Sequence, residues 1–250
     1  GMYKIKIALM FMALFYGSIT WAADQDYKVH LLTENFPPYN MERNGKNFGK
    51  DENIEGIATD IVREMFRRAD IEYTLTLRFP WERVYQQVLT KPDFGVFVMS
   101  RSTEREDLFK WVGPIGPDDW VLLARNDSTI TLQTLEDARQ YKIGTYKGDV
   151  ITEYLENHAI ESISALRDQE NALKLDRGQI DLWATGDPAG RYLAAQEGVR
   201  NLKTILRFNR ADLYLAFNKE TDDAVVAQLQ QALDAMRAQG EIEQYFNKYF

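Results

Sequence analysis

Short apolar segments alternate with longer amphipathic segments along most of this chain. Apolar runs of strand length predict β-strands at residues 27–33, 71–77, 94–99, 120–124, 142–145, 180–184 and 212–217. Helical spacing of apolar side chains predicts helices at residues 57–69, 80–89, 168–177, 222–237 and 241–249, and another that ends near residue 157. The first of these helices places Ile57, Ile61, Met65 and Phe66 on one core-facing side. Alternating strands and helices predict an α/β fold.

One stretch, residues 94–117, combines a buried strand with a cluster of polar side chains. The apolar run ends at Ser100, and Thr103 with Glu106 three positions later has the spacing of a capping box. The pattern predicts a strand that leads directly into a short helix, and the helix is expected to end before Gly113.

Arg105 is unusual in this stretch, because a cation in a first helical turn faces the positive end of the helix dipole. In one interpretation it is a surface charge offset by the neighbouring acids. In the other, its guanidinium converges with the hydroxyls of Ser100 and Ser102 and with free backbone N–H groups on one anion. A carboxylate suits such a site, since arginine offers it a bidentate fork. The spacing leaves both interpretations open.

The loop at residues 34–40, ENFPPYN, follows the first predicted strand directly. Two prolines cannot continue a strand ladder, so the chain must turn at the carboxyl end of that strand. Ligands of open α/β sheets bind at this edge, which makes Glu34 and Tyr39 candidates for contact. Trp81, at the start of a later helix, is suited either to packing or to lining a pocket.

The N-terminal segment has the features of a secretory signal peptide. Lys4 and Lys6 precede an apolar run at residues 7–15, and Thr20-Trp21-Ala22 resembles a cleavage site. We therefore expect residues 1–22 to be removed on export. The mature chain would keep 28 basic and 38 acidic side chains, a formal net charge of about −10. This charge argues against nucleic acid as a partner.

The chain has no cysteine and only two histidines. Disulfides, thiolate metal sites, a cysteine nucleophile and a lipid-bearing cysteine are thereby excluded from this sequence. His30 and His158 are far apart and show no metal-ligand spacing, so we predict neither a metal nor another cofactor. We expect a free soluble protein in the periplasm.

Several motifs together resemble family 3 of the bacterial periplasmic solute-binding proteins, the amino-acid-binding components of ABC importers. These motifs are Ser-x-x-x-x-Arg after the apolar strand, the Phe-x-Trp-x-Gly-Pro run at 109–114, ENFPPYN at 34–40, GIATDIVREMF at 56–66, RGQID at 177–181 and AMRAQGEIEQYFNKYF at 235–250. The resemblance implies a two-lobe periplasmic-binding-protein fold of type II, with a cleft between the lobes that closes on the ligand.

The expected lobe boundaries follow from two crossover segments, at residues 116–119 and 207–211. The first lobe would comprise residues 23–118 and 209–250, and the second lobe residues 119–208. The ligand would bridge the lobes, and the closed form would be recognised by the membrane subunits of the importer. We expect the protein to act as a monomer.

The resemblance also implies roles for particular residues. Arg105 and Ser100 would hold the α-carboxylate of an amino acid, and Asp187 and Glu34 would hold its amine. The expected pocket walls are Tyr39, Trp81, Trp120 and Tyr146. Asp187 also precedes a proline at a helix start, where it could serve as an N-cap. After Gly148 the family has a hydroxyl residue, whereas this chain has Asp149.

Two other functions are compatible with the same fold. Cyclohexadienyl dehydratases and some lytic transglycosylases resemble this chain, and such chemistry needs an acid with a tuned pKa, for which Glu34 and Asp149 are the candidates. A ligand-sensing module that acts in trans is the other alternative. We expect a binding protein rather than an enzyme.

Overall fold

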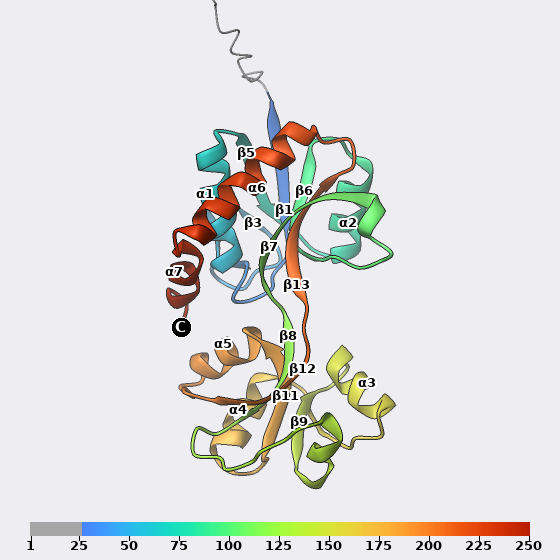
Figure 1. Ribbon diagram of the computed structural model, residues 1–250, viewed down its shortest axis with the longest axis vertical. Coiled ribbons are helices and arrows are strands. Elements are labelled where there is room, and N and C mark those ends of the chain that lie inside the picture. The colour runs from blue at the N-terminus through green and yellow to red at the C-terminus, as the bar shows by residue number, and fades with distance from the viewer. Residues whose placement is uncertain (1–26) are drawn as a thin grey trace, which may run out of the picture.

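The computed structural model describes residues 27–250, which form two lobes joined by paired strands (Figure 1). The expected signal peptide, residues 1–22, lies outside the described residues. The mixed α/β architecture and the two-lobe arrangement confirm the predicted fold class.

The first lobe is built on a six-stranded sheet in the order β3-β5-β1-β6-β13-β7. Its strands are β1 (Lys28–Thr33), β3 (Gly49–Lys50), β5 (Glu72–Leu77), β6 (Phe94–Ser100), β7 (Phe109–Pro117) and β13 (Asp212–Asn218). Strands β5, β1 and β6 are parallel, whereas β13 runs antiparallel to both β6 and β7. A small hairpin-like sheet pairs β2 (Met41–Glu42) with β4 (Ile54–Glu55).

Four helices cover this sheet. They are α1 (Ile57–Ala69), α2 (Trp81–Thr90), α6 (Asp223–Ala238) and α7 (Glu241–Asn247). The predicted core face of α1 is confirmed, since Ile57, Ile61, Met65 and Phe66 are at most 1% exposed. They belong to a hydrophobic cluster that includes α6, while α2 packs a second cluster against the other side of the sheet.

The second lobe has a five-stranded sheet in the order β10-β9-β11-β8-β12. Its elements are β8 (Asp119–Ala124), β9 (Ile143–Tyr146), α3 (Val150–Asn157), β10 (Ile163–Ala165), α4 (Gln169–Asp176), β11 (Leu182–Asp187), α5 (Ala189–Gln196) and β12 (Lys203–Asn209). Two hydrophobic clusters fill the opposite faces of this sheet. The large ring of Trp183 is fully buried in one of them.

The chain passes between the lobes twice. Strand β7 leads through Asp118 into β8, and β12 leads through residues 210–211 into β13, so two strand pairs run side by side from one lobe to the other (Figure 1). The backbone N–H of Asp118 donates to the carbonyl of Ala211 at 2.9 Å, which ties the two crossovers together.

The helix predicted after Thr103 is not formed, and neither is its capping box. The structure has a single 3₁₀ turn, Glu106–Leu108, without a side-chain cap. Glu106 instead pairs with Arg101 at 2.5 Å. The residues that follow, Phe109–Pro117, form strand β7, because β13 offers them a ladder partner that local sequence patterns do not reveal.

Candidate functional site

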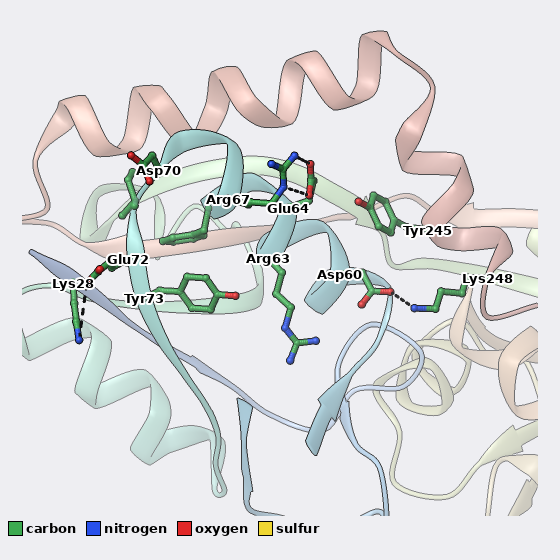
Figure 2. Close-up of a pocket in the computed structure, with 12 residues that line it drawn as sticks. Lys28, Asp60, Arg63, Glu64, Arg67, Asp70, Glu72, Tyr73, Tyr245 and Lys248 are labelled. Atoms are coloured by element: carbon green, nitrogen blue, oxygen red, sulfur yellow. Dashed lines mark hydrogen bonds and ion pairs between the residues drawn. The ribbon is translucent and has the colours of Figure 1, made fainter. Parts of the chain in front are cut away.

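A pocket of about 840 Å³ lies on the outer side of the first lobe, between α1, β5 and the C-terminal helix (Figure 2). Most of its charged side chains pair with one another, as in Lys28–Glu72 at 4.0 Å and Lys248–Asp60 at 3.1 Å. Arg67 likewise pairs with Glu64 at 2.6 Å. None of the residues predicted for the site lines this pocket, so it is not the candidate site.

A smaller cavity of about 280 Å³ lies at the carboxyl ends of β1 and β6, beside the crossover. The residues that line it are Glu34, Asn35, Phe36, Asn40, Trp81, Val98, Met99, Ser100, Arg105, Asp118 and Leu213. Four of the predicted site residues, Glu34, Trp81, Ser100 and Arg105, therefore come together here. The edge formed by the carboxyl ends of parallel strands is the usual ligand site of such sheets.

The guanidinium of Arg105 is held without an acidic partner among the described residues. Its Nη1 donates to the carbonyl of Ser100 at 3.1 Å. Its Cζ lies 5.8 Å from the ring centroid of Trp81 and 5.4 Å from that of Tyr85. The two rings restrict the side chain by cation–π contact and leave other N–H groups available for an anion.

Glu34 and Asn40 add buried hydrogen-bond acceptors to the cavity. The amide Nδ2 of Asn40 donates to the backbone carbonyl of Glu34. The Oε2 atom of Glu34 and the Oδ1 atom of Asn40 are buried, and neither has a donor within the described part of the chain. Burial raises the pKa of the Glu34 carboxyl above its ordinary value. The cavity therefore offers oxygen atoms to a ligand that carries N–H groups.

Asp118 lines the same cavity and was missed by the sequence analysis, which treated residues 116–119 only as a crossover. Burial raises its pKa to about 6, and the negative charges of Asp119 and Asp149 add to the effect. A run of two acids next to proline is typical of an exposed turn, so no local pattern indicates that one of them faces a cavity.

Tyr39 does not line the cavity. Its side chain is fully buried in the first lobe, and its hydroxyl donates to the carbonyl of Pro117. The ring also packs against Phe36 and Phe246. The prediction that Tyr39 forms a pocket wall is therefore wrong for this arrangement, because packing against Phe246 from the last helix holds the ring in the core.

Asp187, Trp120 and Tyr146 belong to the second lobe, and no residue of that lobe lines the cavity in the described chain. Trp120 packs against Tyr154 and Phe208. Tyr146, at the end of β9, is 41% exposed. Contact of these three residues with a ligand stays a prediction that requires the lobes to approach each other.

Asp187 already has two cationic partners. Its carboxylate pairs with Arg191 at 3.3 Å and with Arg207 at 3.0 Å. Arg207 also pairs with Asp119 at 2.5 Å, so one guanidinium links β12 to both β11 and β8. The Asp-Pro pattern at a helix start does not predict either of these two ion pairs.

Residues 27–250 contain no group of His, Cys, Asp or Glu side chains arranged to hold a metal ion. No helix in that range is both long and apolar enough to cross a membrane.

Comparison with protein families places this geometry in context. The family described as "Bacterial extracellular solute-binding proteins, family 3" matches residues 29–250. No curated protein matches the chain significantly.

Three solved structures illustrate the fold similarity. The Lactococcus lactis GlnP substrate binding domain 2 in its open conformation has a TM-score of 0.73 and 16% identity, covering 92% of this chain and 97% of that one. An ancestral cationic amino acid solute binding protein has a TM-score of 0.70 and 16% identity, with 89% and 95% covered. A histidine kinase sensor domain similar to periplasmic binding proteins has a TM-score of 0.61 and 18% identity, with 91% and 98% covered.

Proposed function

The chain belongs to family 3 of the bacterial extracellular solute-binding proteins, and on that premise we propose that it binds an amino acid between its lobes. The observation that carries the proposal is the guanidinium of Arg105, which lines the cavity without an acidic partner among the described residues. It lies over the rings of Trp81 and Tyr85, so it is oriented before a ligand arrives. A bidentate pair with an α-carboxylate fits such a group, and Ser100 lies beside it.

A zwitterion also needs acceptors for its ammonium group. Glu34 lies in the same cavity with one carboxylate oxygen buried and without a donor in the described chain. Asp187 is the second proposed acceptor, which lobe closure would bring to the ligand. The carboxylate of Asp187 is already paired with two arginines. A hydrogen bond from the ligand ammonium should therefore stabilise Glu34 more than Asp187.

We further propose that the protein is exported to the periplasm, acts as a monomer and delivers its ligand to the membrane subunits of an ABC importer. The ligand would stabilise the closed form by contacting both lobes, and the importer would recognise that form. Amino acids are proposed because the site suits a zwitterion and because one structural relative is described as an amino acid solute binding protein.

A thermal-shift screen with the common amino acids, polyamines and small organic acids tests this function. A ligand at about 100 times its dissociation constant adds roughly 2.7 kcal/mol to the free energy of unfolding. We expect at least one amino acid to raise the melting temperature and to bind with one-to-one stoichiometry in calorimetry. Stabilisation by organic acids or polyamines but by no amino acid would contradict the proposal.

The second candidate function is that of an enzyme with the same fold. Asp118 favours it, because a carboxyl with a pKa of about 6 suits proton transfer near neutral pH. Turnover of prephenate or of peptidoglycan by the purified protein distinguishes the two. Binding of an amino acid without turnover of either substrate supports the transport function.

A further inference from the structure

The cavity is lined by more negatively than positively charged side chains. Among the described residues that line it, Arg105 is the one cation, whereas Glu34 and Asp118 are carboxylates. None of the three forms an ion pair within residues 27–250 of the structure. A neutral zwitterion would neutralise Arg105 with its carboxylate and one acid with its ammonium. The second acid would then stay half-buried beside the ligand without a counter-charge, which is unfavourable.

The acceptor atoms of the cavity show the same imbalance. Asn40 is 1% exposed, and its Oδ1 has no donor within the described chain. The Oε2 atom of Glu34 is also buried and has no donor within the described chain. Buried acceptors are normally paired, and each one left unpaired costs free energy. A single ammonium has only three N–H groups to share among these atoms and Asp118.

Asp118 differs sharply from the neighbouring acid of the same crossover. Asp119 accepts hydrogen bonds from Arg207 at 2.5 Å and from the backbone N–H of Ala211 at 2.9 Å. The side chain of Asp118 has no such partner in the part of the chain that the structure describes. It extends toward the second lobe, where a Cβ on Gly186 would lie 3.4 Å from its Oδ1. A purely structural acid would be compensated as Asp119 is.

Building on the proposed function, we propose that Asp118 is a specificity-determining residue that binds a second cationic group, so that the preferred ligand is an amino acid with an ammonium or guanidinium side chain. Arg105 takes the α-carboxylate. Glu34 with Asn40 takes one cationic group and Asp118 takes the other. The charges of the cavity and of the ligand then cancel.

Pairs of ligands that differ only in charge test this inference. Arginine is compared with citrulline and lysine with norleucine, by calorimetry at pH 7.5. We expect the wild type to bind the cationic member of at least one pair about tenfold or more tightly than its neutral partner. In Asp118→Asn, affinity for the cationic member should fall about tenfold or more, and affinity for the neutral member should stay within about threefold.

Asp107→Asn is the matched control. It removes the same charge from the exposed turn beside Arg105, where Asp107 makes no side-chain hydrogen bond or ion pair to the described residues. Its ligand preference should equal that of the wild type. Lys147→Met is the second control, because Lys147 is an exposed cation of the second lobe, two positions before Asp149. Its ligand preference should also equal that of the wild type. A much stronger preference for cationic ligands in Lys147→Met would mean that Lys147 neutralises Asp118 in the wild type, and it would overturn the proposal.

The pH dependence provides an independent readout. Asp118 has a pKa of about 6 and binds a cation only when ionised, so affinity for the cationic ligand should fall about tenfold from pH 7 to pH 5. The groups that face it are Glu34 and Arg105 in the cavity, with Asp119 and Asp149 beside it. Glu34 titrates in both proteins, so the difference between wild type and Asp118→Asn isolates the contribution of Asp118.

The same variant also reports whether the fold is intact. Because burial raises the pKa of Asp118, the free protein should lose stability as pH rises from the unfolded pKa, about 4, to the folded pKa, about 6. Asp118→Asn removes this cost, so its melting temperature above pH 6 should equal or exceed that of the wild type. A large decrease would mean that Asp118 is structural and would overturn the proposal.

The remaining outcomes distinguish a failure of the role proposed for Asp118 from a failure of the proposed function. Tighter binding of citrulline and norleucine than of arginine and lysine would overturn the role of Asp118 and leave amino-acid binding intact. An equal loss of affinity for charged and neutral ligands in Asp118→Asn would do the same. If neither these four ligands nor any other amino acid in the screen binds, the proposed function itself is wrong.

Discussion

At the scale of the residue, Arg105 is the proposed carboxylate anchor, and the described part of the chain orients it without an acidic partner. The turn that carries it is fixed by the backbone N–H groups of Arg105 and Glu106, which donate to the carbonyl of Ser102 at 3.1 and 2.9 Å. The guanidinium then lies over Trp81 and Tyr85. A side chain restricted in this way loses less entropy when it binds a carboxylate.

Substitutions of Arg105 should weaken binding without unfolding the protein. Arg105→Ala should cost about 2–5 kcal/mol of binding free energy, since the ligand carboxylate loses its charged partner. Arg105→Lys keeps the charge but loses the bidentate fork, so binding should still be weaker than in the wild type. Calorimetry with the ligand found in the screen measures both effects.

Arg101→Ala is the control for this pair of variants. Arg101 belongs to the same segment, but it pairs with Glu106 and lies over the rings of Trp111 and Tyr214, away from the cavity lining. Its removal should leave ligand affinity unchanged. Near-wild-type affinity in Arg105→Ala, with thermal stability preserved, would place the carboxylate anchor elsewhere.

At the scale of the element, the crossover strands are held by a small ionic network rather than by apolar packing alone. Arg207 on β12 binds Asp119 on β8 and Asp187 on β11, and these two carboxylates are only 12% and 16% exposed. Removing Arg207 leaves the largely buried Asp119 without a cation and leaves Asp187 with Arg191 as its remaining cation among the described residues. The network therefore stabilises the start of the second lobe.

Arg207→Met should reduce the free energy of unfolding by on the order of 3 kcal/mol. Urea denaturation measures this change. Arg125→Met, at the end of β8, is a matched control, because its pair with Asp127 is exposed and should contribute at most about 1 kcal/mol. Adding Asp187→Asn to Arg207→Met should restore part of the loss. If the single variant unfolds like the wild type, the network does not stabilise the crossover.

At the scale of the whole molecule, the cavity is incomplete in the arrangement described. Its lining comes from the first lobe and the crossover, whereas Tyr146 and Asp187 of the second lobe do not reach it. The lobes do contact each other elsewhere, as where Tyr192 donates to the sulfur of Met41 at 3.6 Å. The two strand pairs that join the lobes are the segments where a hinge would lie (Figure 1).

Small-angle scattering with and without the ligand tests closure. We expect a smaller radius of gyration at saturating ligand, because contacts of the ligand with the second lobe favour the closed form. Arg105→Ala at the same ligand concentration should give the curve of the free protein. An unchanged curve in the wild type, with binding shown by calorimetry, would contradict hinge closure.

The sequence by itself determined the elements whose signals are local. The apolar face of α1 follows from helical spacing, and the end of β6 at Ser100 follows from the change from apolar to polar residues. The same local signals placed Glu34, Ser100, Trp81 and Arg105 next to the ends of elements, and these four residues do meet in one cavity.

Only the tertiary structure decided the features that depend on residues distant in sequence. Residues 109–117 form a strand because β13, about 100 positions later, pairs with them. Tyr39 is buried because Phe246, from the last helix, packs against it. Arg207 pairs with both Asp187 and Asp119, whereas Asp118 pairs with no cation within the described chain, although Asp118 and Asp119 are neighbours in one crossover. Identical residue types acquire different roles here because burial and charge pairing are set by which segments the fold brings together.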